Sequence, residues 1–184
     1  MNTRNSRGKE NPFRGPDARW TVAFLTGACA LFLGVAIGRA DPAAPSKDYQ
    51  NDRVGVRLKI SPDWQQVTVN ESPQTGMIAF NIYTPGHVSV SATRQKWDQP
   101  FDVWTSSDVL TQLFAPGYTV SKATFAGRSC IHVVGHDLNG RRQEAYYSSK
   151  PPYVDDITFI ADDSQWAQFQ PTFNEIKGSI HWTR

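Results

Sequence analysis

The sequence has few cysteines, and their placement excludes a disulfide framework. Of the two cysteines among 184 residues, Cys29 lies in an apolar run and Cys130 lies in a predicted strand. No disulfide can therefore form within the predicted folded domain. Cys130 is flanked by Ser129 and Ile131, which predicts a small buried residue and not a nucleophile.

The sequence also lacks a strong charge of one sign, since its formal net charge is +2. Residues 1–19 carry five basic and two acidic side chains, a surplus of three that exceeds the surplus of the whole chain. The remainder is about neutral, which argues against a phosphate-binding or nucleic-acid-binding surface. A chain with 20% charged and 12% aromatic residues has a globular composition, and its length suits one domain with an appendage.

Residues 20–38 form a run of nineteen residues without a charge. A helix of about 20 apolar residues spans the hydrocarbon layer of a membrane. Five basic residues precede the run and only Arg39 and Lys47 closely follow it, a bias that keeps the N-terminus cytoplasmic. The sequence thus predicts a basic cytoplasmic segment (1–19), a transmembrane anchor (20–38), a linker (39–48) and an extracytoplasmic domain (49–184).

Two alternatives to an anchor remain open. A cleaved signal peptide would use the small residues of 36–40 before the cut, but the apolar run is longer than a usual h-region of about 7–15 residues. Lipidation is the second alternative, because residues 26–29 resemble a bacterial lipobox that ends at Cys29. That motif lacks the usual Leu, and a cut there would leave nine further apolar residues.

Within the domain, alternating residues predict strands. Val54, Val56, Leu58 and Ile60 alternate with smaller or charged residues, the period-two pattern of a strand with one buried face. Further extended runs at 64–69, 77–83 and 88–94 continue this as an antiparallel meander, and 153–161 supplies another strand. A short edge strand is predicted at 179–182.

Helical spacing appears twice. Residues 100–114 predict a helix whose apolar side chains share one face, although 105–108 is also a place for a shorter helix to begin. A second helix follows Asp162, which with Gln165 has the spacing of a capping box. It carries Trp166, Phe169, Phe173 and Ile176, and Pro171 predicts that it is kinked or split.

Asn139-Gly140 lies between two extended runs and predicts a two-residue type I′ hairpin turn. Such a turn would place His136 opposite Gln143 and His132 opposite Tyr147. These elements predict an α+β fold, an antiparallel β-sheet with helices packed on it.

This order of elements resembles the Mog1/PsbP-like superfamily over residues 49–182. The resemblance rests on the strand-Pro-x-Trp entry at 49–64, the mid-chain helix, the turn at 126–128 and the Phe-x-x-Ile-x-x-Ser exit at 173–179. It implies an α/β/α sandwich. Members are mostly non-catalytic, among them photosystem II extrinsic subunits, a nuclear-transport GTPase binder and bacterial envelope lipoproteins. The predicted anchor is most similar to that of the bacterial envelope members. Together they imply a bacterial inner-membrane location with the domain outside, or a periplasmic one after signal cleavage.

The spacing of the acidic residues and histidines predicts neither a catalytic site nor a metal site. His132 and His136 lie on one strand about 13 Å apart, too far to bind one ion without other ligands. The pairs Asp155-Asp156 and Asp162-Asp163 lie about 20 Å apart at opposite ends of a strand, too far for a calcium site or a glycosidase pair. We interpret them as turn and cap residues.

No nucleophile-elbow, P-loop or dinucleotide motif occurs, and Cys130 with His132 lacks a third orienting group. We therefore expect no enzyme activity and no cofactor. The sequence predicts a membrane-tethered domain that binds or stabilises an envelope protein partner. Its predicted contacts are Arg141, Arg142, Tyr146, Tyr147 and Tyr153, the tyrosines as an exposed aromatic patch. A small-ligand carrier or sensor, or a hydrolase with a site assembled from distant residues, are the alternatives.

Overall fold

The computed structural model describes residues 46–71, 75–82 and 88–184. Its strands are β1 (Lys47–Asn51), β2 (Val56–Ile60), β3 (Gln65–Glu71), β4 (Thr75–Ile82), β5 (Val88–Lys96), β6 (Thr119–Phe125), β7 (Arg128–His136), β8 (Arg142–Lys150), β9 (Tyr153–Ala161) and β10 (His181–Trp182). Its helices are α1 (Phe101–Trp104), α2 (Ser107–Leu110) and α3 (Asp163–Ser179). The predicted segments 1–19 and 20–38 lie outside the described residues, and no described helix is long and apolar enough to cross a membrane.

The strands form two antiparallel sheets. Seven strands pair in the order β3-β4-β5-β9-β8-β7-β6, which confirms the predicted β3-β4-β5 meander. The smaller sheet has the order β1-β2-β10. The prediction that β2 leads directly into the meander was wrong, because β2 pairs with β1 and β10 instead. Lys47 and Asp48, assigned to the linker by the sequence, belong to β1.

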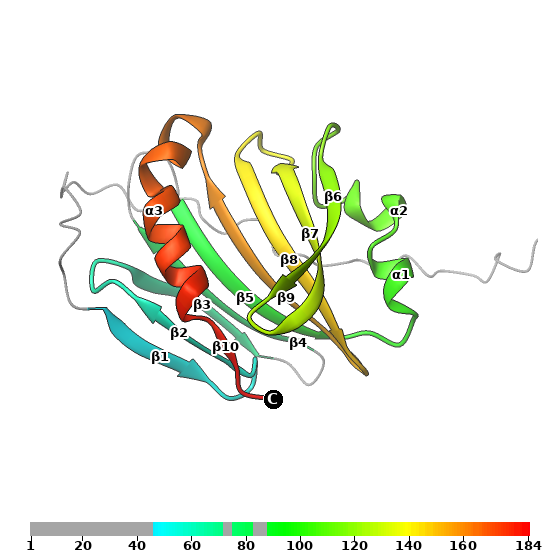
Figure 1. Cartoon of the computed structure of the whole chain (residues 1–184), viewed down its shortest axis with the longest axis horizontal. Coiled ribbons are helices and arrows are strands. Elements are labelled where there is room, and N and C mark those ends of the chain that lie inside the picture. The colour runs from blue at the N-terminus through cyan, green and yellow to red at the C-terminus, as the bar shows by residue number, and fades with distance from the viewer. Residues whose placement is uncertain (1–45, 72–74, 83–87) are drawn as a thin grey trace, which may run out of the picture. The chain divides into compact units, whose positions relative to one another are not determined.

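The large sheet has a helical layer on each face (Figure 1). Helix α3 and the small sheet cover one face, here called the α3 face, which buries Val90, Ile157 and Phe159. Helices α1 and α2 lie on the other face, the α1–α2 face, where Trp104 packs against Tyr147 with ring centroids 6.2 Å apart. This arrangement confirms the predicted α+β class.

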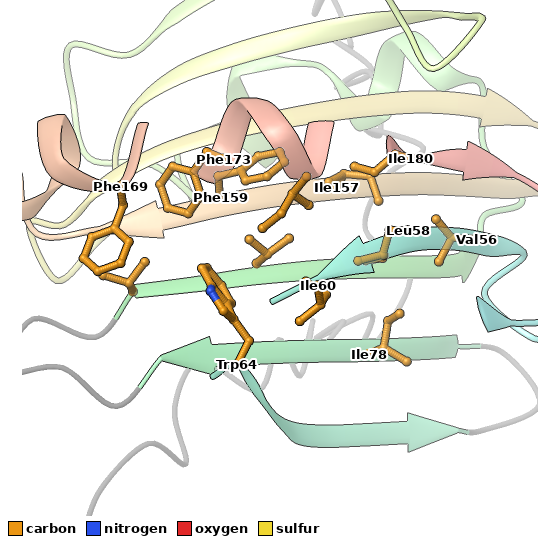
Figure 2. Packing of buried hydrophobic residues seen from close by; sticks show 14 of the residues in the cluster. Val56, Leu58, Ile60, Trp64, Ile78, Ile157, Phe159, Phe169, Phe173 and Ile180 are labelled. Atoms are coloured by element: carbon orange, nitrogen blue, oxygen red, sulfur yellow. The ribbon is translucent and has the colours of Figure 1, made fainter. Parts of the chain in front are cut away.

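The main core lies between α3, the small sheet and the α3 face (Figure 2). The predicted alternation of β2 is confirmed, since Val56, Leu58 and Ile60 are buried and the residues between them are exposed. The predicted apolar face of α3 is buried as well. Ring contacts of Phe173 with Phe159 and Trp64 join the helix to β9 and to the connection between β2 and β3.

Helix α3 differs from its prediction in two details. It continues through Pro171, so the predicted split was wrong. Pro171 and Ala167, whose carbonyl would have accepted the missing bond, are both exposed, so water can satisfy that carbonyl. Asp162 is the N-cap residue as predicted, but its side chain makes no capping hydrogen bond, and the capping box was therefore wrong.

The mid-chain segment forms two short helices, as in the alternative in which a shorter helix begins at 105–108. Helix α1 ends at Trp104, and Ser106 adopts an extended conformation (ψ 157°) before α2 starts at Ser107. The break still leaves Trp104, Leu110 and Phe114 buried. The apolar spacing therefore predicted the buried residues correctly, whereas the prediction of one continuous helix over 100–114 was wrong.

The β7–β8 hairpin has a different turn from the one predicted. Residues 137–141 connect the strands, and the Asp137 N–H donates to the Arg141 carbonyl at 2.8 Å. This bond closes a loop of three residues, Leu138, Asn139 and Gly140, among which only Gly140 has a positive φ (79°). Asp137 determines this turn because its Oδ1 accepts the backbone N–H groups of Asn139 and Arg141, both at 2.9 Å. The register shifts by one residue, and His132 pairs with Tyr146 and not with Tyr147.

A type I′ turn does occur, between β6 and β7. Ala126 and Gly127 have φ values of 48° and 78°, and Phe125 pairs directly with Arg128. An alanine in this conformation is unfavourable because its Cβ approaches the following carbonyl oxygen. The turn is therefore imposed by strand pairing and not by the preference of Ala126.

The β7–β8 turn predicts unequal effects of two alanine substitutions. Gly140→Ala is expected to lower the free energy of unfolding by about 1 kcal/mol, because a Cβ is strained at this φ. Asn139→Ala is expected to change it by less than about 0.5 kcal/mol. Urea unfolding of the full chain, followed by circular dichroism, measures both. Equal losses would indicate the type I′ turn, which needs a positive φ at both positions.

Candidate functional site

The α3 face is only partly covered. Helix α3 lies over the central strands, and the β6–β7 side of the face is accessible, with Thr119, Ser121 and His136 exposed. Figure 1 shows α3 on the β5 and β9 side of this face and β6 at the opposite edge. The accessible strip is the candidate functional site, because it presents an ordered group of aromatic and charged side chains.

Three rings form the centre of this strip, here called the ring stack. Phe125 stacks on Tyr146 with centroids 4.0 Å apart and an interplanar angle of 14°. His132 also stacks on Tyr146, at 4.4 Å and 10°. The second contact follows from the observed register, which pairs His132 directly with Tyr146. All three residues are half-buried, so the rings remain accessible to a partner.

Glu144 fixes the ring stack. Its carboxylate accepts hydrogen bonds from the Tyr146 hydroxyl and from Lys177 Nζ of α3, both at 2.5 Å, and lies 3.0 Å from His132 Nε2. Burial alone would raise the pKa of Glu144, but the hydrogen bonds from Lys177 and Tyr146 outweigh it and lower that pKa. Glu144 is therefore an ionised acceptor that holds the rings in place.

The groups near the ring stack are unsuited to nucleophilic chemistry. Burial, reinforced by the bond to Glu144, raises the pKa of Tyr146, which keeps its hydroxyl a neutral donor. Burial also raises the pKa of Cys130, whose Sγ donates to the Ala123 carbonyl at 3.5 Å. A protonated, buried thiol is a poor nucleophile.

A buried ion cluster borders the strip. Arg94 binds Asp155 through two hydrogen bonds of 2.7 and 2.9 Å, and Arg128 binds the same carboxylate at 2.7 Å. Arg128 also stacks over Trp182, 4.5 Å from its ring centroid. The cluster joins β5, β9, β7 and β10. Its role is structural, since Asp155 is fully buried and its carboxylate is satisfied.

The predicted contact residues do not form one patch. Tyr147 is 3% exposed and faces Trp104 on the α1–α2 face, so its prediction as an exposed contact was wrong. Tyr153 lies beside Arg94, and Arg141 pairs with Asp137 at 2.6 Å. Arg142 shares the α3 face with Tyr146 and stacks over Trp166 at 4.9 Å. Tyr146 and Tyr147 are neighbours in β8 and therefore point to opposite faces of the sheet, so one exposed patch could not include both.

His132 and His136 contact different carboxylates, those of Glu144 and Asp163. His136 lies 3.0 Å from Asp163, and in the described ranges no three His, Cys, Asp or Glu residues are grouped as a metal site. Asp155 and Asp156, interpreted as turn residues, lie instead inside β9 on opposite faces. That interpretation was wrong for this pair.

One open groove lies away from the ring stack, between the small sheet and the C-terminal part of α3. It has a volume of about 450 Å³ and is lined by Asp48, Arg57, Lys59, Glu175, Gly178, Ser179 and His181. Arg57 pairs with Asp48 across it at 3.2 Å. The groove is open and charged, unlike the apolar pockets that enclose small ligands.

Sequence reasoning missed Phe125, Glu144 and Lys177. Phe125 and Glu144 could have been found from the correct hairpin registers, because these place both residues on the same face as His132. Lys177 lies 33 residues from Glu144, and no local pattern connects the two.

On the α1–α2 face, Asp156 is an unusual acid. Burial raises the pKa of Asp156 from 3.8 to about 7, although hydrogen bonds from Thr93 and Thr158 oppose this shift. Thr158 Oγ1 donates to it at 3.4 Å, and Tyr147 lies directly opposite in β8. The folded domain therefore keeps this proton at a pH where the unfolded chain has released it.

Comparisons with known proteins support the fold. No protein-family model and no curated protein sequence matches the chain. Cyanobacterial PsbP (CyanoP) from Synechocystis sp. PCC 6803 has a similar solved structure, with 14% identity, a TM-score of 0.50, and coverage of 79% of this chain and 98% of that one. The chain thus has a PsbP-like fold, which confirms the fold that the resemblance implied.

Two other solved structures align with lower TM-scores. LpqN of Mycobacterium tuberculosis, described as involved in cell envelope biogenesis, has 18% identity and a TM-score of 0.42, with coverage of 78% of this chain and 88% of that one. A Pseudomonas aeruginosa protein of unknown function has 16% identity and a TM-score of 0.38, with 70% and 91% covered. The fold assignment rests on the PsbP (CyanoP) structure, which at 14% identity establishes a shared fold and not a shared role.

The Glu144 contacts predict a large effect of a small substitution. Glu144→Gln removes the charge that Lys177 and Tyr146 stabilise, and it is expected to lower the free energy of unfolding by about 1–3 kcal/mol at pH 7. Glu175→Gln, at an exposed position of α3, is the matched control and is expected to have little effect. Urea unfolding measures both, and equal effects would contradict the role assigned to Glu144.

Asp156 predicts a pH dependence. Between pH 3.8 and about 7 the folded state binds more protons at this site than the unfolded state, so the contribution of Asp156 to stability falls as pH rises. Asp156→Asn is expected to remove this slope and raise the free energy of unfolding at pH 8 by about 1–2 kcal/mol. Unfolding curves at pH 4, 6 and 8 test it, with exposed Asp98→Asn as the control. An unchanged slope would contradict it.

Proposed function

We propose that this chain is a non-catalytic envelope protein in which residues 20–38 anchor the folded domain to the outer side of a bacterial inner membrane. The domain binds or stabilises a protein partner through the accessible strip of the α3 face. The uncharged run at 20–38 and the basic residues before it support the anchor.

The ring stack is the observation that carries the proposal. Half-exposed aromatic rings that are already held in one conformation contribute contact area at little further entropic cost. Phe125, Tyr146 and His132 are fixed by mutual stacking and by the bonds to Glu144. Arg142 lies on the same face of β8, and arginine with aromatic residues is enriched in protein interfaces.

The chemistry of the strip favours binding over catalysis. The Glu144 carboxylate already accepts hydrogen bonds from Lys177 and Tyr146, and the Cys130 thiol is buried. Both groups therefore stabilise the structure. The alternative of a small-ligand carrier or sensor needs an enclosed, largely apolar pocket. The groove beside β2 is open and charged and does not favour that alternative.

Partner capture from intact membranes tests the proposal. The full chain is crosslinked in membranes and recovered, as are its Phe125→Ala and Val103→Ala variants. Val103 is an exposed apolar residue on α1, at the other face of the sheet, and so provides a matched control. Phe125→Ala is expected to reduce the recovered partner about tenfold, the loss that 1.4 kcal/mol produces. Equal recovery with both variants would contradict a role of the ring stack.

A further inference from the structure

Strand β6 is an edge of the large sheet as the described residues form it. It pairs with β7 from Thr119 to Phe125 in a continuous register without a bulge, and it contains no proline. Within the described part of the chain, β6 has no second neighbouring strand. Long, regular edge strands of this kind are templates for pairing with another strand.

The β6–β7 turn determines which backbone groups face outward. A two-residue type I′ loop makes Phe125 and Arg128 a hydrogen-bonded pair, so every second residue from Phe125 back to Thr119 bonds to β7. The N–H and C=O groups of Val120, Lys122 and Thr124 therefore point away from the sheet. These three residues are exposed, and Val120 is one of the exposed large apolar residues of the domain.

We propose that β6 pairs antiparallel with β6 of a second copy of this chain, about a two-fold axis at Ser121. Hydrogen bonds then form between Val120 and the partner's Lys122, and between Lys122 and the partner's Val120. Ser121 lies directly opposite the partner's Ser121.

The charge of Lys122 and the length of β6 disfavour the two neighbouring registers. A two-fold axis at Lys122 would place two ammonium groups opposite each other, which is unfavourable. An axis at Val120 would shorten the paired segment. With the axis at Ser121, residues 119–123 of the two β6 strands pair with each other, and the aliphatic part of each Lys122 covers the exposed Val120 of the other copy.

The β6–β6 pairing depends on the proposed membrane anchor to be strong enough to persist. One strand pair buries less area than the roughly 1,200 Å² of a stable interface, so pairing in dilute solution is weak. Confinement of both chains to one membrane raises their effective concentration. The geometry agrees, because a two-fold axis normal to the sheet keeps both α3 faces, and the β1 strand packed over each, on the same side of the combined sheet.

Disulfide formation tests the register in the full chain. In a Cys29→Ser, Cys130→Ser background, Ser121→Cys is introduced and membranes are oxidised. Non-hydrogen-bonded pairs have Cα atoms about 4.5 Å apart, within disulfide range, whereas two copies of Val120→Cys would be separated by more than about 7 Å. We expect at least tenfold more disulfide dimer for Ser121→Cys than for Val120→Cys. Equal yields, or a higher yield for Lys122→Cys, would overturn the proposal.

A proline substitution tests the pairing itself. Lys122→Pro removes an outward N–H group without removing a β6–β7 bond, a position at which edge strands accept proline. It is expected to reduce the Ser121→Cys dimer at least tenfold, whereas Lys122→Gln retains it. Circular dichroism confirms folding of each variant. An undiminished dimer with Lys122→Pro would refute pairing by β6.

Alkaline extraction of the same membranes separates the two proposals. If the chains stay in the membrane, the anchor is supported. If Ser121→Cys and Val120→Cys then give equal yields of disulfide dimer, edge pairing is contradicted. Chains that are extracted contradict the anchor. A Ser121→Cys yield that still exceeds the Val120→Cys yield then supports pairing without the anchor, whereas equal yields contradict both proposals.

Discussion

The packing of Phe173 is the contact on which the two-sheet architecture depends. This fully buried ring of α3 lies against Trp64, which follows β2, against Phe159 of β9 and against Trp166 of α3. Neither the small sheet nor α3 buries its apolar face alone, and each completes the other over the α3 face. Because aromatic residues bury large apolar areas, this cluster accounts for much of the driving force that holds the layers together.

The same packing leaves part of the sheet uncovered. Helix α3 lies over β9 and β5, and its Lys177 reaches toward β8 to bind Glu144. Beyond Glu144 the α3 face continues onto β7 and β6 with histidine, serine and threonine side chains. These residues suit an accessible surface, and so the ring stack with its supporting carboxylate forms where helix coverage ends.

Much of the fold was predictable because its residues follow simple periods. In β2 every second side chain is buried, and in α3 every third or fourth side chain is buried. Burial of this kind leaves a regular pattern of apolar residues in the sequence. Single turns were less predictable. Asn139-Gly140 favours a type I′ turn by composition, yet the Asp137 side chain binds two backbone N–H groups and stabilises a three-residue loop. The partition into two sheets was also not encoded locally.

In the candidate site, the turn between β7 and β8 determines which side chains lie next to each other. Since side chains alternate between the faces of a sheet, a shift of one residue exchanges the neighbours on each face. The predicted register paired His132 with Tyr147, and the separately predicted tyrosine patch included both Tyr146 and Tyr147. In the observed register His132 meets Tyr146, and Tyr147 lies under α1. The ring stack depends in addition on Lys177, so its full geometry required the tertiary fold as well as the correct turn.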